Sequence, residues 1–313
     1  MQLTLLAASF QLVIISIGIL AQLLLLASLL RKTDWSINPG FLLIGSLSCA
    51  DLIPCTVRWV GCMVTLAVGR IAVPQWFLVL LGRLDNFAYA ATSLHMIALA
   101  YNRLVGVCLP FSYVKYAGVR VTNKIIGLIW SVSAIYGSLR FFFCCQFHWN
   151  PQLVAPTYVQ SPNQTNDMIV ADYLISFSTI FLPTIMYLVF SVRLVYMYCR
   201  KMTQLTAQRS VDPKLCIQFS LVMSVYLGLV FAFYPASKST EMNFAWLIAG
   251  YAGALNNAVN PFIYLVFNPT IRAAVVATVL RRSKNRVRPV RNAPKSANRY
   301  RIPRPKPFIE TRF

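Results

Sequence analysis

Charge, and acidic residues above all, are scarce in this sequence. Of 313 residues, 8 are Asp or Glu and 12% are charged, whereas 58% are apolar. Because charged residues make up roughly a quarter of a typical soluble domain, this composition excludes a soluble globular domain of this size. Histidine occurs only twice, and the apolar segments contain neither paired acids nor a cluster of metal ligands. These absences argue against a membrane enzyme, whose chemistry would need one or the other.

Cysteine is present but lacks the spacing of a metal site. Nearly all eight cysteines lie within or at the ends of apolar segments, and none lies in the connector 147–169. We therefore expect free thiols that pack as small apolar residues. The eight positions are Cys49, Cys55, Cys62, Cys108, Cys144, Cys145, Cys199 and Cys216.

Long apolar segments are abundant. A helix needs roughly 20 apolar residues to cross a bilayer, and the alternating pattern of membrane β-barrels is absent. The sequence predicts an all-α membrane protein, a seven-transmembrane helix bundle over residues 1–280 whose first helix is retained rather than cleaved as a signal peptide. The seven segments span about 4–30, 38–66, 75–108, 122–146, 170–199, 213–237 and 243–267.

Basic residues are unevenly distributed among the connectors. Alternate connectors are rich in Lys and Arg, whereas the others contain only Arg70 and Lys238. The positive-inside rule then places the N-terminus outside the plasma membrane and the C-terminus in the cytoplasm. The inner connectors hold Arg31, Lys32, Lys115, Arg120, Arg200, Lys201 and Arg209.

Residues 281–313 form a basic tail with twelve Lys or Arg and one acid. Its Pro and Arg content and its lack of apolar periodicity predict disorder. A basic segment directly after a membrane helix favours binding to anionic lipid of the inner leaflet over binding to nucleic acid. In the outer connector 147–169, Asn163-Gln-Thr165 is a candidate N-glycosylation site.

Polar residues inside membrane helices are costly and mark candidate functional sites. Asp51 lies deep in the second helix, and its expected neighbours are Thr92 in the third and Asn256, Asn257 and Asn260 in the seventh. One carboxylate among neutral oxygens suits a small hard cation such as sodium. A buried hydrogen-bonded network that only fixes helix packing is the alternative.

A second group of charged residues lies in the outer halves of the second, third and fourth helices. Arg58 follows Asp51 by seven residues, which is two turns along about the same face. Asp85 is the only acid in these outer halves, where Arg83 and Arg140 also lie. This group is either an internal Arg–Asp pair that lines a cavity or a ligand pocket with surplus positive charge.

The inner end of the third helix carries Asn102 and Arg103. Arg103 either extends to the lipid headgroups or contacts a partner from the cytoplasm. Three consecutive helices contain a proline, at Pro183, Pro235 and Pro261. Each proline frees a backbone acceptor and bends its helix, which suggests a bundle that can change shape near its centre.

Several motifs occur in register on these helices. They are SLSCADL in the second, Asn102-Arg103-Leu104 ahead of VCLP in the third, Trp130 in the fourth, and NPFIY followed by FNPTIR in the seventh. Together they resemble the rhodopsin-like (class A) G-protein-coupled receptors over residues 10–281. The resemblance implies a receptor that converts binding of an extracellular ligand into activation of a heterotrimeric G protein, with arrestin as a further partner.

The resemblance also implies roles for matching positions. Asp51 would be the acid of a sodium site, with Thr92, Asn256 and Asn260 as neighbours. Retinal is not expected, because residues 243–267 contain no lysine. Residues 269–281 would form a short amphipathic eighth helix. The switch and G-protein-coupling positions would be Asn102, Arg103, Phe233, Pro235, Asn260, Pro261 and Tyr264.

The sequence departs from the family pattern at several of these positions. Asn102 replaces the usual acid before the arginine, so Arg103 is held less strongly in the resting state and elevated basal signalling is expected. Gln22 replaces an asparagine and Phe233 a tryptophan. Leu78 stands near the usual disulfide cysteine and the connector 147–169 has no cysteine, so that disulfide is expected to be missing.

The ligand class stays open. Asp85 falls where amine receptors and some peptide receptors place the acid that binds an amine, but Ala254 stands where amine receptors usually have a tyrosine. The surrounding arginines instead suit an anionic ligand. The candidate pocket residues are Asp85, Arg58, Arg83, Arg140 and Tyr89.

Two other functions remain as alternatives. One is an atypical seven-helix receptor that acts without G-protein coupling, because so many switch positions differ. The other is a membrane transporter, although transporters often show internal repeats with matching broken helices and no such repeat occurs between the halves of this chain.

Overall fold

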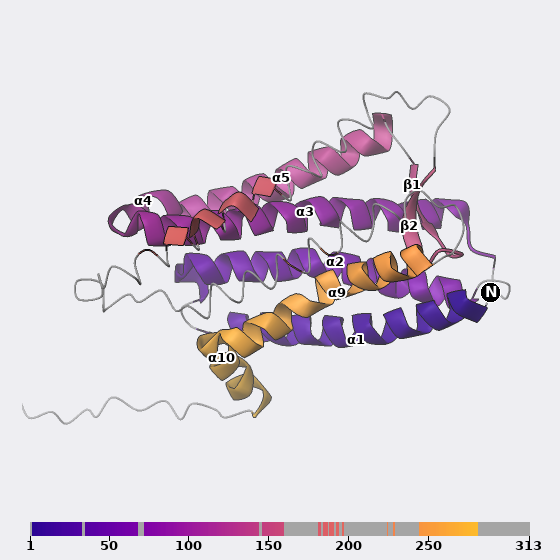
Figure 1. The fold of residues 1–313 in the computed structure, drawn as a ribbon, viewed down its shortest axis with the longest axis horizontal. Coiled ribbons are helices and arrows are strands. Elements are labelled where there is room, and N and C mark those ends of the chain that lie inside the picture. The colour runs from indigo at the N-terminus through magenta and orange to yellow at the C-terminus, as the bar shows by residue number, and fades with distance from the viewer. Residues whose placement is uncertain are drawn as a thin grey trace, which may run out of the picture.

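The computed structural model describes most of the chain outside the fifth and sixth predicted helices (Figure 1). Asn163, Pro183, Phe233, Pro235 and the basic tail lie outside the described residues. The described residues are 2–32, 35–67, 72–143, 146–159, 244–280 and a few positions between 181 and 228.

Five long helices match five of the predicted segments closely. α2 packs between α1 and α3, α9 lies against α1 and α2, and α5 lies against α3. By length and composition, α1 and α2 can each cross a membrane, and α3 and α9 qualify when each is taken with the short helix that follows it. The bounds are α1 Gln2–Leu30, α2 Pro39–Ala67, α3 Gln75–Cys108, α5 Val119–Phe143 and α9 Phe244–Phe267.

Short helices turn the chain at one end of the bundle. After α3, Pro110 begins a 3-10 turn that leads into α4 (Tyr113–Ala117). After α9, the Asn268 side chain accepts hydrogen bonds from the backbone N–H groups of Thr270 and Ile271, and Pro269 occupies the first helical position. Both residues favour a helix start, so α10 (Pro269–Val279) begins here at 99° to α9. The eighth helix predicted from the sequence is confirmed.

A β-hairpin lies at the other end of the bundle. β1 (Gln146–Asn150) pairs antiparallel with β2 (Ala155–Val159). Neither strand is predicted from the sequence pattern, and the helix expected to run to 146 ends at Phe143, because an apolar run alone does not distinguish helix from strand. The Asn150 carboxamide accepts from the Gln152 backbone N–H at 2.9 Å and orders the turn.

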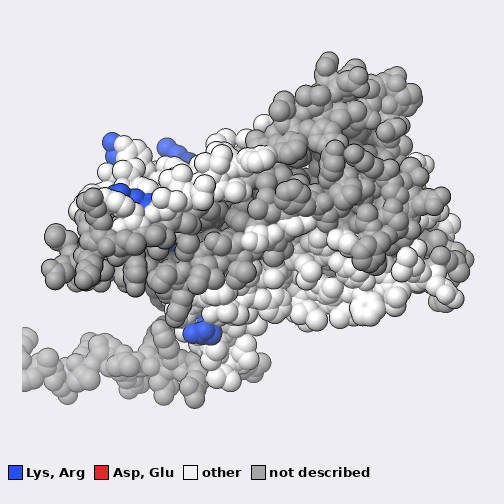
Figure 2. All heavy atoms as spheres, viewed as in Figure 1, with Lys and Arg blue, Asp and Glu red and all other residues white. Residues whose placement is uncertain are grey.

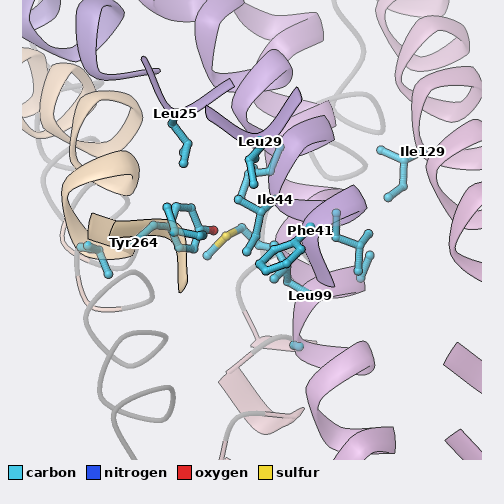
Figure 3. Packing of buried hydrophobic residues seen from close by; sticks show 14 of the residues in the cluster. Leu25, Leu29, Phe41, Ile44, Leu99, Ile129 and Tyr264 are labelled. Carbon is cyan, nitrogen blue, oxygen red and sulfur yellow. The ribbon is translucent and has the colours of Figure 1, made fainter. Parts of the chain in front are cut away.

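Two apolar clusters hold the helices together. In one, near α10, Figure 3 shows Tyr264 of α9 among side chains that include Leu25, Leu29, Ile44 and Leu99 from α1, α2 and α3. The other lies beneath the hairpin. Since lipid is as apolar as these side chains, the helices associate through close packing rather than through exclusion of water.

Gly18 of α1 illustrates this close packing. It lies so near Ala258 of α9 that a Cβ at position 18 would overlap the alanine. Small residues at both positions therefore bring α1 and α9 together, which places polar groups of the two helices within hydrogen-bonding distance.

Candidate functional site

Asp51 lies at the centre of a polar cluster in the middle of the bundle. It is fully buried, and its Oδ1 accepts from the Thr92 hydroxyl at 3.0 Å. Its Oδ2 accepts from the Asn260 amide at 2.7 Å and from Gln22 Nε2 at 3.4 Å. A buried carboxylate requires such donors. We call Asp51, Thr92, Asn260 and Gln22 the Asp51 cluster; its members come from α2, α3, α9 and α1.

Gln22 is the functional residue that the sequence prediction did not place in this cluster. Pro261 has no N–H, so the carbonyl of Asn257, four residues earlier in α9, loses its helical partner. Gln22 Nε2 donates to this carbonyl at 3.2 Å. The signal in the sequence was Pro261 itself. It leaves the Asn257 carbonyl without its helical donor, so another helix must supply one.

Among the described residues, Asn256 makes no hydrogen bond to Asp51. Its amide donates instead to Asn257 Oδ1 at 3.4 Å, and the Asn257 amide donates to the carbonyl of Gly253 at 3.2 Å. Both asparagines line a cavity of about 20 Å³ between α2, α3 and α9. The other lining residues are Pro54, Arg58, Asp85, Tyr89 and Thr92.

The side chains of the Asp51 cluster are chemically suited to binding a small cation. The carboxylate and the Thr92 hydroxyl are oxygen ligands, and Gln22 Oε1 is buried without a hydrogen-bond partner in the part of the chain that the structure describes. A sodium ion takes ligands of this kind.

Arg58 and Asp85 form a bidentate ion pair. Arg58 Nε lies 3.0 Å from Asp85 Oδ1, and Nη2 lies 3.2 Å from Oδ2. The two side chains are 12% and 7% exposed. Of the other predicted pocket residues, Tyr89 lines the cavity, Arg83 is half-buried on α3, and Arg140 lies on α5, where its side chain is outside the described part.

At the end of α3, the side-chain hydrogen bonds of Asn102 within the described residues go to α4. Its amide donates to the Tyr113 hydroxyl at 3.2 Å, and it is buried. Arg103 is half-buried, with Nη2 near Gly40 at the start of α2. The asparagine thus connects α3 to the turn that follows it.

Tyr264 of the NPFIY motif is buried in the apolar cluster near α10. Its side chain is 1% exposed, and among the described residues its hydroxyl has no hydrogen-bond partner.

His95 is a buried, hydrogen-bonded residue of α3. It lies 2.7 Å from Ser46 Oγ and 2.7 Å from the Ala91 carbonyl oxygen. Trp130 of α5 donates to the same serine at 3.0 Å.

The second histidine, His148, lies outside the helices on β1. Burial lowers the pKa of His148 below its usual value, which keeps the imidazole neutral at pH 7.

Comparison with known proteins agrees with this architecture. The model of the family described as serpentine type 7TM GPCR chemoreceptor Srx matches residues 12–268. The chain belongs to this chemoreceptor family. It is therefore a multi-pass membrane receptor with a seven-helix bundle, and not an enzyme.

Mammalian olfactory receptors are distant relatives of this chemoreceptor. Olfactory receptor 1E16 of Mus musculus is 22% identical over 253 residues, which covers 76% of this chain and 78% of the relative. Olfactory receptor-like protein I9 of Rattus norvegicus is 21% identical over 255 residues, with the same coverage. Olfactory receptor 7A42 of Mus musculus is 24% identical over 201 residues, covering 61% of this chain and 62% of the relative.

Proposed function

We propose that this chemoreceptor converts binding of a small extracellular ligand into activation of a heterotrimeric G protein at the plasma membrane. The observation that supports this function most directly is the Asp51 cluster. It joins four helices through hydrogen bonds that can exchange partners, beside an α9 segment where Pro261 interrupts the helical pattern. A bundle whose polar groups can exchange hydrogen-bond partners can adopt two arrangements of its helices. A ligand that binds one arrangement more tightly shifts the equilibrium toward it.

Coupling to the G protein is assigned to the end of α3. Arg103 lies there beside Asn102, whose amide contacts Tyr113 and supplies no negative charge. A neutral neighbour holds an arginine less strongly than a carboxylate does. We therefore expect the receptor to signal without ligand, and arrestin to recognise the same end of the bundle.

The test is ligand-free nucleotide exchange on a panel of G proteins in membranes with matched receptor levels. Asn102→Asp should lower basal exchange about fivefold, because a charge-assisted hydrogen bond is about 1 kcal/mol stronger than a neutral one. Arg103→Ala should lower it further. Tyr113→Phe is the control: it removes the hydrogen bond to Asn102 without adding charge and should not lower exchange.

Flat exchange in wild type and both variants, with every G protein, would contradict this proposal. A seven-helix receptor that acts without G-protein coupling would then be the better description.

A further inference from the structure

The β-hairpin contributes side chains to the interior of the bundle. Connecting segments usually run over a protein's surface, yet Trp149 and Val154 are both fully buried. They share an apolar cluster with residues of α1, α2, α3 and α9. We call Trp149 and Val154 the hairpin plug. The plug therefore fills space among four helices that are distant from it in sequence.

The surface of α2 is complementary to the Trp149 ring. At Gly61 a Cβ would overlap the indole, so the glycine leaves the space that the ring occupies. The Thr65 hydroxyl donates to the Gly61 carbonyl at 2.9 Å, which leaves its oxygen to accept from the indole N–H at 3.3 Å. A buried indole needs one such acceptor. We call Gly61 and Thr65 the indole slot.

The plug lies between the cavity near Asp51 and the hairpin end of the bundle. On each of α2, α3 and α9, a residue that shares the plug's apolar cluster is three or four residues from a residue that lines the cavity. That separation is about one helical turn, and in all three helices the cluster residue is nearer the hairpin. The cluster residues are Cys62, Leu81 and Ala254, and the corresponding lining residues are Arg58, Asp85 and Asn257.

The hairpin backbone is strained where it enters the cluster. Val154 has a φ of 51°, a conformation that a β-branched residue rarely adopts and that costs free energy unless its surroundings impose it. The hydrogen bonds from Trp149 to Thr65 and from Thr4 of α1 to the Gln152 carbonyl are long, at 3.3 and 3.4 Å. Withdrawal of the plug would relieve the strain and would break only these weak polar contacts among the described residues.

We propose that the hairpin is a lid. With Trp149 in the indole slot, the lid closes the bundle on the side of α1, α2, α3 and α9, and a ligand that enters from this end must displace it. The apparent affinity for such a ligand is then reduced by the fraction of receptors whose lid is open. The proposal goes beyond the receptor function above, because opening of the lid requires neither ligand nor G protein.

Cys62 reports opening of the lid. It is a free, fully buried cysteine in the same apolar cluster. Purified full-length receptor in lipid nanodiscs is treated with 2-sulfonatoethyl methanethiosulfonate, and modification of Cys62 is followed over time by peptide mass spectrometry. The reference is Gln152→Cys, at an exposed position of the hairpin turn. Wild-type Cys62 should react about a hundredfold more slowly than this reference, because it reacts only while the lid is open.

Two substitutions in the indole slot should open the lid without changing the hairpin itself. Gly61→Ala places a Cβ where the ring lies and should accelerate modification of Cys62 about tenfold or more. Thr65→Val keeps the side-chain shape but removes the acceptor of the indole N–H, and should accelerate it about fivefold.

Each slot variant has a matched control on the same helix. Gly45→Ala adds a Cβ whose nearest neighbour, Leu29 Cδ1, is 3.9 Å away. Thr56→Val removes a hydroxyl that, like that of Thr65, donates to the carbonyl four residues earlier, at 2.8 Å. Both controls should leave the rate at Cys62 near that of wild type.

Three results would refute the lid. Wild-type Cys62 that reacts as fast as the Gln152→Cys reference would show that the hairpin does not close the bundle. Equal rates in wild type and both slot variants would show that the slot does not hold Trp149. Equal acceleration by the controls would assign the effect to general loosening of α2. Because the readout involves no G protein, absence of nucleotide exchange would refute the proposed coupling and leave the lid standing.

Discussion

At the scale of single residues, the Asp51 cluster shows how one proline determines which side chains hydrogen-bond nearby. Pro261 leaves the Asn257 carbonyl without a helical partner, and Gln22 supplies the donor. The same glutamine amide reaches Asp51 at 3.4 Å, so the carboxylate and the interruption in α9 share one side chain. Any change in α9 near the proline must therefore alter the contacts of Asp51.

Sodium binding is the prediction that belongs to this scale. We expect replacement of NaCl by N-methylglucamine chloride to lower the Tm of wild-type receptor in detergent, because a ligand at ten times its Kd stabilises the folded state by about 1.4 kcal/mol. Asp51→Asn removes the charged ligand, and its Tm should be the same in both salts. Equal Tm values for wild type in the two salts would exclude the sodium site.

At the scale of elements, the β-hairpin is attached to the helices by Trp149. This side chain is fully buried, lies against Gly61 of α2 so closely that a Cβ there would collide with the indole ring, and donates to the Thr65 hydroxyl at 3.3 Å. It shares an apolar cluster with Leu78 of α3, near the position where the family usually has a cysteine. The sequence predicts that this chain lacks the disulfide that the family usually has near Leu78. The indole of Trp149 connects the hairpin to the bundle in the same region.

Substitution of Trp149 tests this attachment. Trp149→Ala should lower the free energy of unfolding by about 3–5 kcal/mol, the usual cost of emptying a buried aromatic site, as measured by thermal unfolding in detergent. Trp149→Phe should cost less, because it keeps most of the packing and loses the N–H donor. Trp76→Ala is the control, since that tryptophan is 67% exposed and should have little effect. A reductant that lowers the Tm of wild type as much as Trp149→Ala would show that a disulfide holds the hairpin instead.

At the scale of the whole molecule, charge distinguishes the two ends of the bundle. Figure 2 shows Lys and Arg side chains at the end that carries α4 and α10, and no described Asp or Glu on the visible face. The hairpin and the start of α1 lie at the opposite end (Figure 1). The exposed basic residues at the charged end are Arg31, Lys115, Arg120, Lys124 and Arg272.

Orientation in the membrane is the prediction at this scale. The positive-inside rule places the charged end in the cytoplasm, so the connector with Asn163 faces outward. Receptor expressed in eukaryotic cells should carry an N-glycan that endoglycosidase removes and that Asn163→Gln abolishes, seen as a mobility shift on gels. A C-terminal tag should be accessible to antibody only after permeabilisation. A tag that is accessible on intact cells would reverse the orientation.

Much of the architecture was predictable because its signals are local. The bounds of α1, α2, α3 and α9 follow from apolar segments of membrane length, and Asn268-Pro269 marks the start of α10 before any contact is known. The pairing of Asp51 with Thr92 and Asn260 was also expected, first from the polar residues of the neighbouring helices and then from the resemblance to a receptor family. The hairpin was not predicted, because an apolar run alone does not distinguish helix from strand.

The sequence by itself determined that this protein is a helical membrane protein, because hydropathy, proline and capping residues act on the chain within a few turns. Only the tertiary structure decided which polar groups meet. It paired Arg58 with Asp85 rather than leaving both for a ligand, directed Asn102 to Tyr113, and brought Gln22 to a carbonyl 235 residues away. The physical reason is that these contacts depend on the rotation and spacing of whole helices. Packing of small residues, such as Gly18 against Ala258, sets that rotation and spacing across the bundle.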